Sequence, residues 1–203
     1  MAERPPPRLV LASASPFRRR MLEAAGLSFE VVPADVDEAA IKHDLLRAGS
    51  TSSGVAKALA AAKAEAVSAH LPEALVIGAD QVLALDQDLF SKPASIAQAR
   101  EQLLRLRGKT HHLHSAAALV AGGKSVWMLV DSAILAMRPF SDAFLASYLA
   151  EVGDRVRHTV GAYEIEGRGI QLFERIEGDI FTIIGLPLLP LLRELRGRGA
   201  IDA

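Results

Sequence analysis

The sequence predicts an α/β fold in which helices flank a mixed β-sheet, and three observations support this class. Apolar runs typical of strands alternate along the chain with segments of helical spacing. Residues 111–120 and 125–137 are two long strand-like segments on either side of a Gly-Gly pair, which predicts an antiparallel hairpin. Hydrophobic residues make up 50% of the 203 residues, and charged residues make up 23%. This composition can bury a core, and the length suits one domain or two small lobes.

The first third of the chain contains two strands, two helices and a loop. Residues 8–12 (RLVLA) predict a short strand, and Ser15 then caps a helix that a glycine closes. Residues 28–33 alternate as a strand does. Residues 34–44 (ADVDEAAIKHD) are acidic and have no clear period, so we expect a loop with a functional role. The alanine-rich residues 50–70 predict a helix.

The rest of the chain continues in the same way. Residues 74–79 (ALVIGA) predict a buried strand that stops at Asp80, and residues 82–85 could continue it beyond that carboxylate. Near the C-terminus, several glycines precede a short strand. The remaining helices are expected at residues 95–107, at residues 141–151 and from Pro187 to about Arg196.

Charge and cysteine content exclude several classes of protein. The 23 basic and 24 acidic side chains give a net charge of −1, whereas a protein that grips nucleic acid is usually basic, so we expect no nucleic-acid partner. The absence of cysteine excludes disulfides, thiolate-zinc sites and cysteine nucleophiles. No run reaches membrane-spanning length, and the proline-rich start, residues 1–7, is a disordered tail rather than a signal peptide. A cytoplasmic protein without a membrane partner is therefore expected.

The first candidate site is the segment SASPFRRR, which follows a strand and opens a helix. Its hydroxyl groups, free backbone N–H groups and guanidinium groups suit a polyphosphate, with Ser13, Ser15, Arg18 and Arg19 as the phosphate-binding residues. Arginines in a first helical turn oppose the helix dipole, a placement that a purely structural helix should avoid. The alternative is a capped helix with a solvated basic face.

The second candidate site is a set of acidic residues beside this segment. Carboxylates near a phosphate site suit a divalent metal, and one of them can act as the base that activates water. Asp35 is interpreted as a solvated loop residue, while Asp37 and Glu38 remain candidates. Asp80 stands out because an acid directly after an apolar strand is costly unless it is paired or coordinated.

Lysines and histidines are less informative on their own. Lys63 and Lys92 are each interpreted as surface residues, which is the usual place of a lone lysine. His111, His112 and His114 lie on a predicted strand whose alternation allows at most two of them on one face. We therefore expect no metal role for these histidines.

These segments together resemble the Maf family of nucleoside triphosphate pyrophosphatases. The matching stretches follow one another over nearly the whole chain: LVLASASPFRRRMLEAAGLSFEVVPADVDE, KALAAAKAEA, VIGADQV, SKP, AREQLLRLRGKTH and VGAYEIEGRGIQLFERIEGDIFTIIGLPLLPLL. The resemblance implies a single domain over residues 1–203, related to the inosine-triphosphate pyrophosphatases, with two lobes and a central cleft, and often dimeric. It also implies hydrolysis between the α and β phosphates of a nucleotide with a divalent metal, Mg²⁺ or Mn²⁺.

The resemblance also assigns roles to individual residues. Asp80 matches the catalytic aspartate of the family, which accepts a proton, and Glu38 matches the acid that supports the metal site, so that Glu38 and Asp80 form the expected metal pair. The phosphate-contacting positions of the family correspond to Ser13, Arg18, Lys63 and Lys92. Lys63 and Lys92 gain a functional role only through this resemblance.

Three residues distinguish the branches of the family. Phe17, Gln81 and Glu166 replace the Arg, Thr and Gln of the branch that acts on dTTP and UTP, and they resemble the 7-methyl-GTP branch. A carboxylate can accept two hydrogen bonds from a guanine edge, and an aromatic ring can stack on a base made cationic by methylation. Phe17 could instead be a core residue of its helix. The sequence thus predicts a 7-methyl-GTP pyrophosphatase, with a dTTP/UTP pyrophosphatase or a non-catalytic nucleotide-binding regulator of cell division as alternatives.

Overall fold

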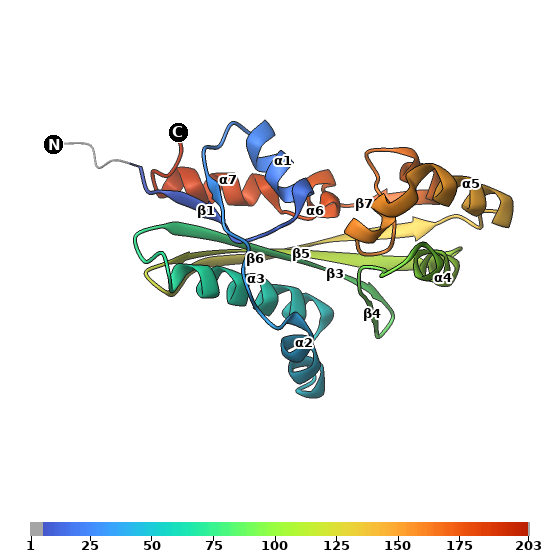
Figure 1. Cartoon of the computed structure of the whole chain (residues 1–203), viewed down its shortest axis with the longest axis horizontal. Coiled ribbons are helices and arrows are strands. Elements are labelled where there is room, and N and C mark those ends of the chain that lie inside the picture. Colours follow the sequence, from blue (N-terminus) through green and yellow to red (C-terminus); the bar gives the residue numbers. More distant parts are fainter. Residues whose placement is uncertain (1–5, 203) are drawn as a thin grey trace.

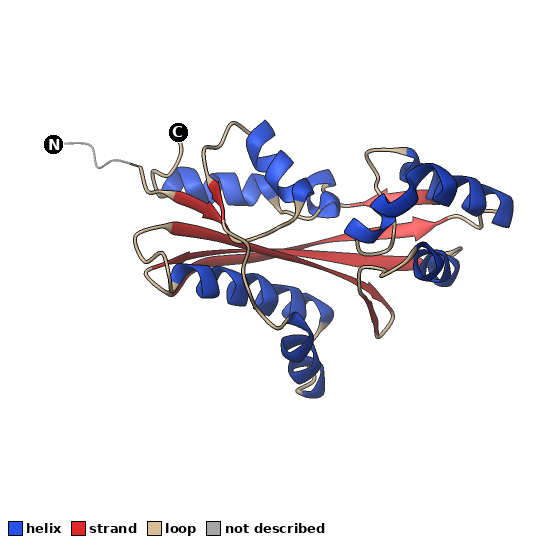
Figure 2. Cartoon of the chain, in the orientation of Figure 1, coloured by secondary structure: helices blue, strands red, loops and turns tan. Residues whose placement is uncertain are grey.

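The computed structural model describes residues 6–202, which form one mixed seven-stranded sheet with helices on both faces (Figure 2). The strands are β1 (Leu9–Leu11), β2 (Glu30–Val31), β3 (Leu75–Leu85), β4 (Asp88–Phe90), β5 (Thr110–Ala121), β6 (Lys124–Met137) and β7 (Phe173–Glu177). The α-helices are α1 (Pro16–Ala24), α2 (Glu38–Arg47), α3 (Ser52–Ser68), α4 (Ile96–Leu106), α5 (Asp142–Val152), α6 (Ile180–Ile184) and α7 (Leu188–Gly197). Two 3₁₀ helices, η1 and η2, cover Gly153–His158 and Arg168–Leu172. Of the predicted tail, residues 1–5 lie outside the described residues.

The sheet is mixed, as predicted, with strand order β2-β1-β3-β5-β6-β7 and with β4 paired to β3. β1 runs parallel to β2 and β3, while β5 is antiparallel to β3 and β6, and β7 is antiparallel to β6. The predicted hairpin is confirmed: Gly122 and Gly123 connect β5 to β6 with φ angles of 56° and 71°. Both angles lie in the left-handed region that glycine adopts without strain.

The long strands β3, β5 and β6 cross the molecule and carry helices at both ends (Figure 1). At one end, α3 covers one face of the sheet and α1 and α7 cover the other, and a cluster of buried apolar side chains fills each interface. At the other end, α4 and α5 enclose a further cluster that includes Phe140 and Tyr148. We call these ends the α3 lobe and the α5 lobe. The candidate site lies where they meet along β3.

The predicted loop at residues 34–44 is wrong, because helix α2 begins at Glu38. The Asp37 side chain caps it by accepting a hydrogen bond from the Ala40 N–H at 2.9 Å. Glu38 in the first turn and Arg47 in the last turn both complement the helix dipole. No residue of α2 is fully buried, and only Ile41 and Leu45, one helical turn apart, pack against the core, so the apolar pattern is too short to reveal the helix.

The predicted stop at Asp80 is wrong and the alternative is confirmed, because β3 continues without interruption through residues 82–85. Antiparallel pairing with β5 extends from Leu75 to Ala84, and Asp80 lies opposite Ala116 in the middle of that ladder. The backbone hydrogen bonds of the ladder hold the strand together regardless of the polar side chain. Asp80 is therefore a buried residue within the sheet, with 5% of its surface exposed.

The other predicted helices are confirmed, and serine or threonine caps start several of them. Ser15, Thr51, Ser95 and Ser141 each accept a hydrogen bond from a backbone N–H of the first turn. Two short elements, β4 and α6, are not predicted by the sequence, because segments of three and five residues are too short to show a clear period. Among the described residues, no helix is both long and apolar enough to cross a membrane.

Candidate active site

A lysine bridges two carboxylates at the centre of the site. The Lys63 ammonium lies 2.6 Å from Asp80 Oδ1 and 2.8 Å from Glu38 Oε1. These residues come from α3, β3 and the start of α2. Gly78 makes the close approach of α3 to β3 possible, because a Cβ at this position would come within 2.1 Å of the Ala60 carbonyl oxygen. Lys63 is 9% exposed, so its interpretation as a surface residue is wrong.

The charges around Lys63 have a direct effect on Glu38. Burial raises the pKa of the Glu38 carboxyl, but the hydrogen bond and charge of Lys63, with smaller effects from Lys42 and Lys92, outweigh it and lower the pKa below its usual value. Glu38 is therefore a carboxylate at neutral pH. Of the two Asp80 oxygens, Oδ1 is held by Lys63, while Oδ2 is buried and has no hydrogen-bond partner within the described residues.

Arg18 is the arginine that α1 turns into the site. Its Nε donates to the Gly185 carbonyl oxygen at 2.9 Å, and its Nη1 donates to the Ala79 carbonyl oxygen at 2.9 Å and to Ser13 Oγ at 3.1 Å. Burial lowers the pKa of the guanidinium, while Asp80 and Glu38 act in the opposite direction. Within the described residues, Nη2 donates to no protein acceptor. Arg18 is thus a fixed cation with a donor available to a ligand.

The structure does not bring the neighbouring arginines to the same place. Arg19 pairs with Glu23 at 2.7 Å on the exposed side of α1, away from the site, contrary to its predicted phosphate-binding position. Arg20 lies over the Phe17 ring, 4.9 Å from its centroid. Successive helical residues point about 100° apart, so three in a row cannot converge on one ligand. The run of three arginines therefore contributes one cation to the site.

These groups surround a pocket of about 320 Å³, which we call the phosphate end. Its cationic side chains outnumber its two carboxylates, Glu38 and Asp80, by four to two. Ser15 lines the pocket, whereas Ser13 lies behind it, bonded to Arg18. The cationic residues of the phosphate end are Arg18, Lys42, Lys63 and Lys92. This arrangement is typical of a pocket that binds a compound of several negative charges.

Lys92 stands at the rim of the phosphate end, and its side chain is exposed, as the sequence predicts. Partial removal from water between the pocket walls lowers its pKa, and the positive charges of Arg18 and Lys63 lower it further. The carboxylates of Glu38 and Asp80 act in the opposite direction but do not cancel these effects. An anion in the pocket would remove much of this repulsion.

Sequence reasoning missed four polar residues that line the phosphate end: Lys42, Ser91, His158 and Thr159. Lys42 follows Glu38 by one helical turn, with 3.8 Å between its ammonium and Glu38 Oε2. Recognising α2 as a helix would have placed both side chains on one face. His158 ends η1 in the α5 lobe and Thr159 follows it, and no local pattern in the sequence points to them.

A smaller pocket adjoins the phosphate end, and we call it the base end. The three predicted specificity residues, Phe17, Gln81 and Glu166, all line it, and Phe17 and Gln81 also line the phosphate end. Phe17 is half-buried at the boundary between the two pockets instead of lying deep in the core. The base end encloses about 20 Å³, above the roughly 10–15 Å³ that a cavity needs to hold one water molecule but far too little for a nucleotide base. It is closed to a base in this structure.

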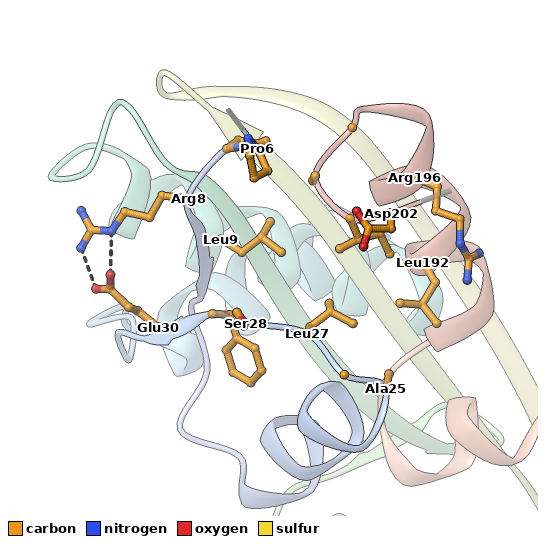
Figure 3. Close-up of a pocket in the computed structure, with 16 residues that line it drawn as sticks. Pro6, Arg8, Leu9, Ala25, Leu27, Ser28, Glu30, Leu192, Arg196 and Asp202 are labelled. Carbon is orange, nitrogen blue, oxygen red and sulfur yellow. Dashed lines mark hydrogen bonds and ion pairs between the residues drawn. The ribbon is translucent and has the colours of Figure 1, made fainter. Parts of the chain in front are cut away.

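A larger hollow of about 1310 Å³ lies elsewhere, between the start of β1, the end of α1 and α7 (Figure 3). Leu9, Leu27 and Leu192 form much of its floor, and the Arg8 guanidinium binds Glu30 through two hydrogen bonds of 2.8 and 2.6 Å. Arg8 also pairs with Glu73 at 3.1 Å. Two arginines and two acidic residues line this hollow, so it has no excess of positive charge, and the phosphate end is the better candidate despite its smaller volume.

The oxygen donors of the phosphate end fit a divalent cation. Asp80 Oδ2 is buried without a partner in the described part of the chain, and Glu38 has one carboxylate oxygen 3.8 Å from Lys42. Within residues 6–202, no three or more His, Asp or Glu side chains converge as a complete protein-only metal site. Mg²⁺ is commonly bound by one or two carboxylates together with substrate phosphates. Asp80 and Glu38 could hold such an ion in the presence of a phosphate ligand.

The fold and the pocket define an α/β protein with a site for a small polyphosphate between two lobes. The chain belongs to the Maf family, because the family model described as Maf-like protein matches residues 8–198. It is 53% identical to a protein of Rhizobium etli named 7-methyl-GTP pyrophosphatase, over 97% of this chain and 98% of that one. A Mesorhizobium japonicum protein of the same name is 54% identical over 96% and 98% of the two chains. A Sphingopyxis alaskensis protein named nucleoside triphosphate pyrophosphatase is 49% identical over 94% and 97%.

Proposed function

We propose that this protein hydrolyses 7-methyl-GTP to the nucleoside monophosphate and pyrophosphate. The observation that carries the proposal is the buried Asp80 carboxylate in the lining of a cationic pocket, because its Oδ2 has no hydrogen-bond partner among residues 6–202. Phe17 and Gln81 join that pocket to the base end, so one nucleotide can contact both. The names of relatives that share about half of the sequence support the same reaction.

The phosphates bind where the cations are. Arg18 is held by two backbone carbonyl oxygens, so its charge is positioned before the ligand arrives. Lys42 and Lys92 also line the pocket, and their ammonium groups can contact the outer phosphates. Helix α1 adds one further donor for a phosphate, the N–H group of Phe17, because the helix begins with a proline and the two N–H groups after Phe17 bond to Ser15.

Asp80 takes the proton from the water that attacks the α phosphorus. Its Oδ2 can accept this proton because Lys63 holds only the other oxygen. The Lys63 ammonium also keeps Asp80 and Glu38 together despite their like charges. A divalent cation, Mg²⁺ or Mn²⁺, held by Asp80 and Glu38 would supply Lewis-acid polarisation of the phosphate.

The base is read at the base end. Glu166 lies there with an exposed side chain, and a carboxylate can accept from both N–H donors of a guanine edge. The half-buried Phe17 offers an aromatic face to a base that methylation has made cationic. The base end must widen to admit a purine, because it is closed in this structure. The reaction would remove a modified nucleotide from the cytoplasmic pool.

A nucleotide panel tests the proposal. Release of pyrophosphate is measured for 7-methyl-GTP, GTP, dTTP and UTP, each without metal and with Mg²⁺ or Mn²⁺. We expect the highest kcat/KM for 7-methyl-GTP and no release without metal. A preference for dTTP or UTP would contradict the assigned base. Tight nucleotide binding without pyrophosphate release under any condition would contradict the enzyme and support a regulator.

A further inference from the structure

The side-chain amide of Gln81 is held in one orientation. Its Nε2 lies 3.0 Å from Ser115 Oγ, 3.1 Å from the Thr182 carbonyl oxygen and 2.9 Å from the Ile183 carbonyl oxygen. Backbone carbonyl oxygens only accept hydrogen bonds, so the amide must present its NH₂ group to them. Its carbonyl oxygen, Oε1, is then the polar atom left to face the two pockets that Gln81 lines.

Ser115 helps to fix the orientation of the Gln81 side-chain amide. Its hydroxyl donates to the Thr182 carbonyl oxygen at 2.6 Å, so its remaining lone pair faces the Gln81 NH₂ group. Ser115 is fully buried on β5, directly opposite Gln81 in the β3–β5 ladder. Ser115 therefore bonds both to the Gln81 amide and to the Thr182 carbonyl oxygen, and the Gln81 amide donates to the same carbonyl oxygen.

The same strand row anchors α6. Asp131 lies opposite Ser115 in the β5–β6 ladder, and its Oδ2 accepts a hydrogen bond of 2.7 Å from the Thr182 hydroxyl. Gln81, Ser115 and Asp131 thus form a row across three strands, and each of them bonds to Thr182. No residue of this row except Gln81 lines the phosphate end or the base end.

We propose that Ser115 is a positioning residue for base recognition, which keeps the Gln81 carbonyl oxygen turned toward the nucleotide. The site then offers acceptors from both Gln81 and Glu166, which suit the N–H donors of a guanine edge and disfavour the carbonyl oxygens of a pyrimidine. This inference rests on the proposed function, because it concerns the base of the same substrate. It assigns a role in specificity to a residue that does not touch the substrate.

The kinetic test uses Ser115→Ala, with Ser68→Ala as the matched control. Ser68 is also fully buried and accepts a hydrogen bond from the Gly123 N–H, but it lies on α3 and lines neither the phosphate end nor the base end. We expect Ser115→Ala to lower the ratio of kcat/KM for 7-methyl-GTP to that for UTP by about two- to tenfold, the effect of one lost hydrogen bond. Ser68→Ala should leave the ratio unchanged.

A double-mutant cycle shows whether Ser115 acts through Gln81. In the Gln81→Ala background, Ser115→Ala should cause no further change in the ratio, because the amide that it positions is absent. A further drop of the same size in that background, or no drop in the wild-type background, would overturn the inference.

A measurement without turnover separates this inference from the proposed function. In the ligand-free protein, NMR should show slow solvent exchange of the Gln81 NH₂ protons compared with those of the exposed Gln87, and faster exchange in Ser115→Ala. Exchange of Gln81 as fast as that of Gln87 in the wild type would overturn the fixed orientation. A protein with the protected amide but no pyrophosphate release would instead contradict the proposed function alone.

Discussion

The phosphate end and the base end share Phe17 and Gln81 but differ in nearly every physical property. The phosphate end has a volume of about 320 Å³ and contains four cationic side chains, whereas the base end encloses about 20 Å³. Arg18 and Lys63, at the phosphate end, are already fixed by carbonyl oxygens or carboxylates. At the base end, Glu166 stands exposed at the edge of a closed space.

This difference teaches where catalysis and selectivity reside. A preorganised charged site loses little free energy to reorganisation when a phosphate binds, so it can serve any nucleoside triphosphate. A closed pocket must open for its base, and the free energy of opening is recovered only by a base that forms good contacts. We therefore expect substitutions at the phosphate end to change the rate for all substrates, and substitutions at the base end to change the choice among them.

The largest expected effect is at the phosphate end, in Asp80→Asn. The amide cannot accept the proton of the attacking water, so kcat should fall by about 10²- to 10⁴-fold for every nucleotide. The measurement is steady-state pyrophosphate release, with a thermal melt to verify folding. Asp88→Asn changes an exposed aspartate that pairs with Arg105 and should retain kcat. Near-wild-type turnover of Asp80→Asn would show that another group is the base.

The next effect is at the base end, in Glu166→Gln. Replacing a charged acceptor that bonds the guanine edge should lower kcat/KM for 7-methyl-GTP by about 10- to 100-fold, with little change for UTP. Glu174→Gln is the matched control, because Glu174 is an exposed glutamate on β7 that lines neither the base end nor the phosphate end. An equal loss of kcat/KM for both nucleotides would contradict the assignment of selectivity to the base end.

A smaller effect is expected for Lys92→Met, which removes a charge from the rim of the phosphate end. KM should rise about tenfold, because the phosphates lose one charged partner. The ligand-free protein should become more stable, because the lowered pKa shows that the folded state disfavours the Lys92 charge. Melting temperatures of both proteins with and without nucleotide measure the two effects. A lower melting temperature of the ligand-free variant would contradict this reasoning.

The smallest effect concerns the support of the base end. His111 is fully buried beside Tyr163, with 2.8 Å between Nε2 and the Tyr163 hydroxyl, and Tyr163 lines the base end. Burial, with a smaller effect of His112, lowers the pKa of His111 to about 4 from its usual 6.5. Between these values the unfolded chain binds more protons, so the stability contributed by neutral His111 is present above pH 6.5 and is lost as the pH falls toward 4.

Melting temperatures between pH 4 and 7 measure this loss. His111→Gln, which stays neutral, should reduce the pH dependence in this window, while the exposed His112→Gln should not. An unchanged pH dependence in His111→Gln would mean that another group controls acid stability.

Much of the fold follows from short-range signals in the sequence. The caps at Ser15 and Ser141 and the glycine pair between β5 and β6 depend on neighbouring residues, so each could be predicted from a few positions. Helix α2 could not, because only two of its side chains, Ile41 and Leu45, pack against the core, and two apolar positions in an acidic segment do not show a helical period. The strand end placed at Asp80 was misjudged because the pairing partner, β5, lies more than 30 residues further along the chain.

The prediction of the site residues was less complete than the prediction of the fold. Lys63 and Lys92 could be named only through the family resemblance, and Lys42 and His158 were missed. Arg19 was wrongly placed with Arg18, because adjacent residues in a sequence point in different directions on a helix. A list of residues states which chemical groups are available, and it does not state which of them converge.

By itself the sequence determined the fold class, the capped helices, the hairpin and the membership of a family, because these depend on local chemistry and on the order of segments. Only the tertiary structure decided that Lys63 lies between Asp80 and Glu38, that one arginine of three enters the pocket, and that the Gln81 amide donates to carbonyl oxygens of α6. Each of these results needs segments distant in the chain to pack together. Packing sets the direction of a side chain and its exposure to water, and these decide what its charge or hydrogen bond can do.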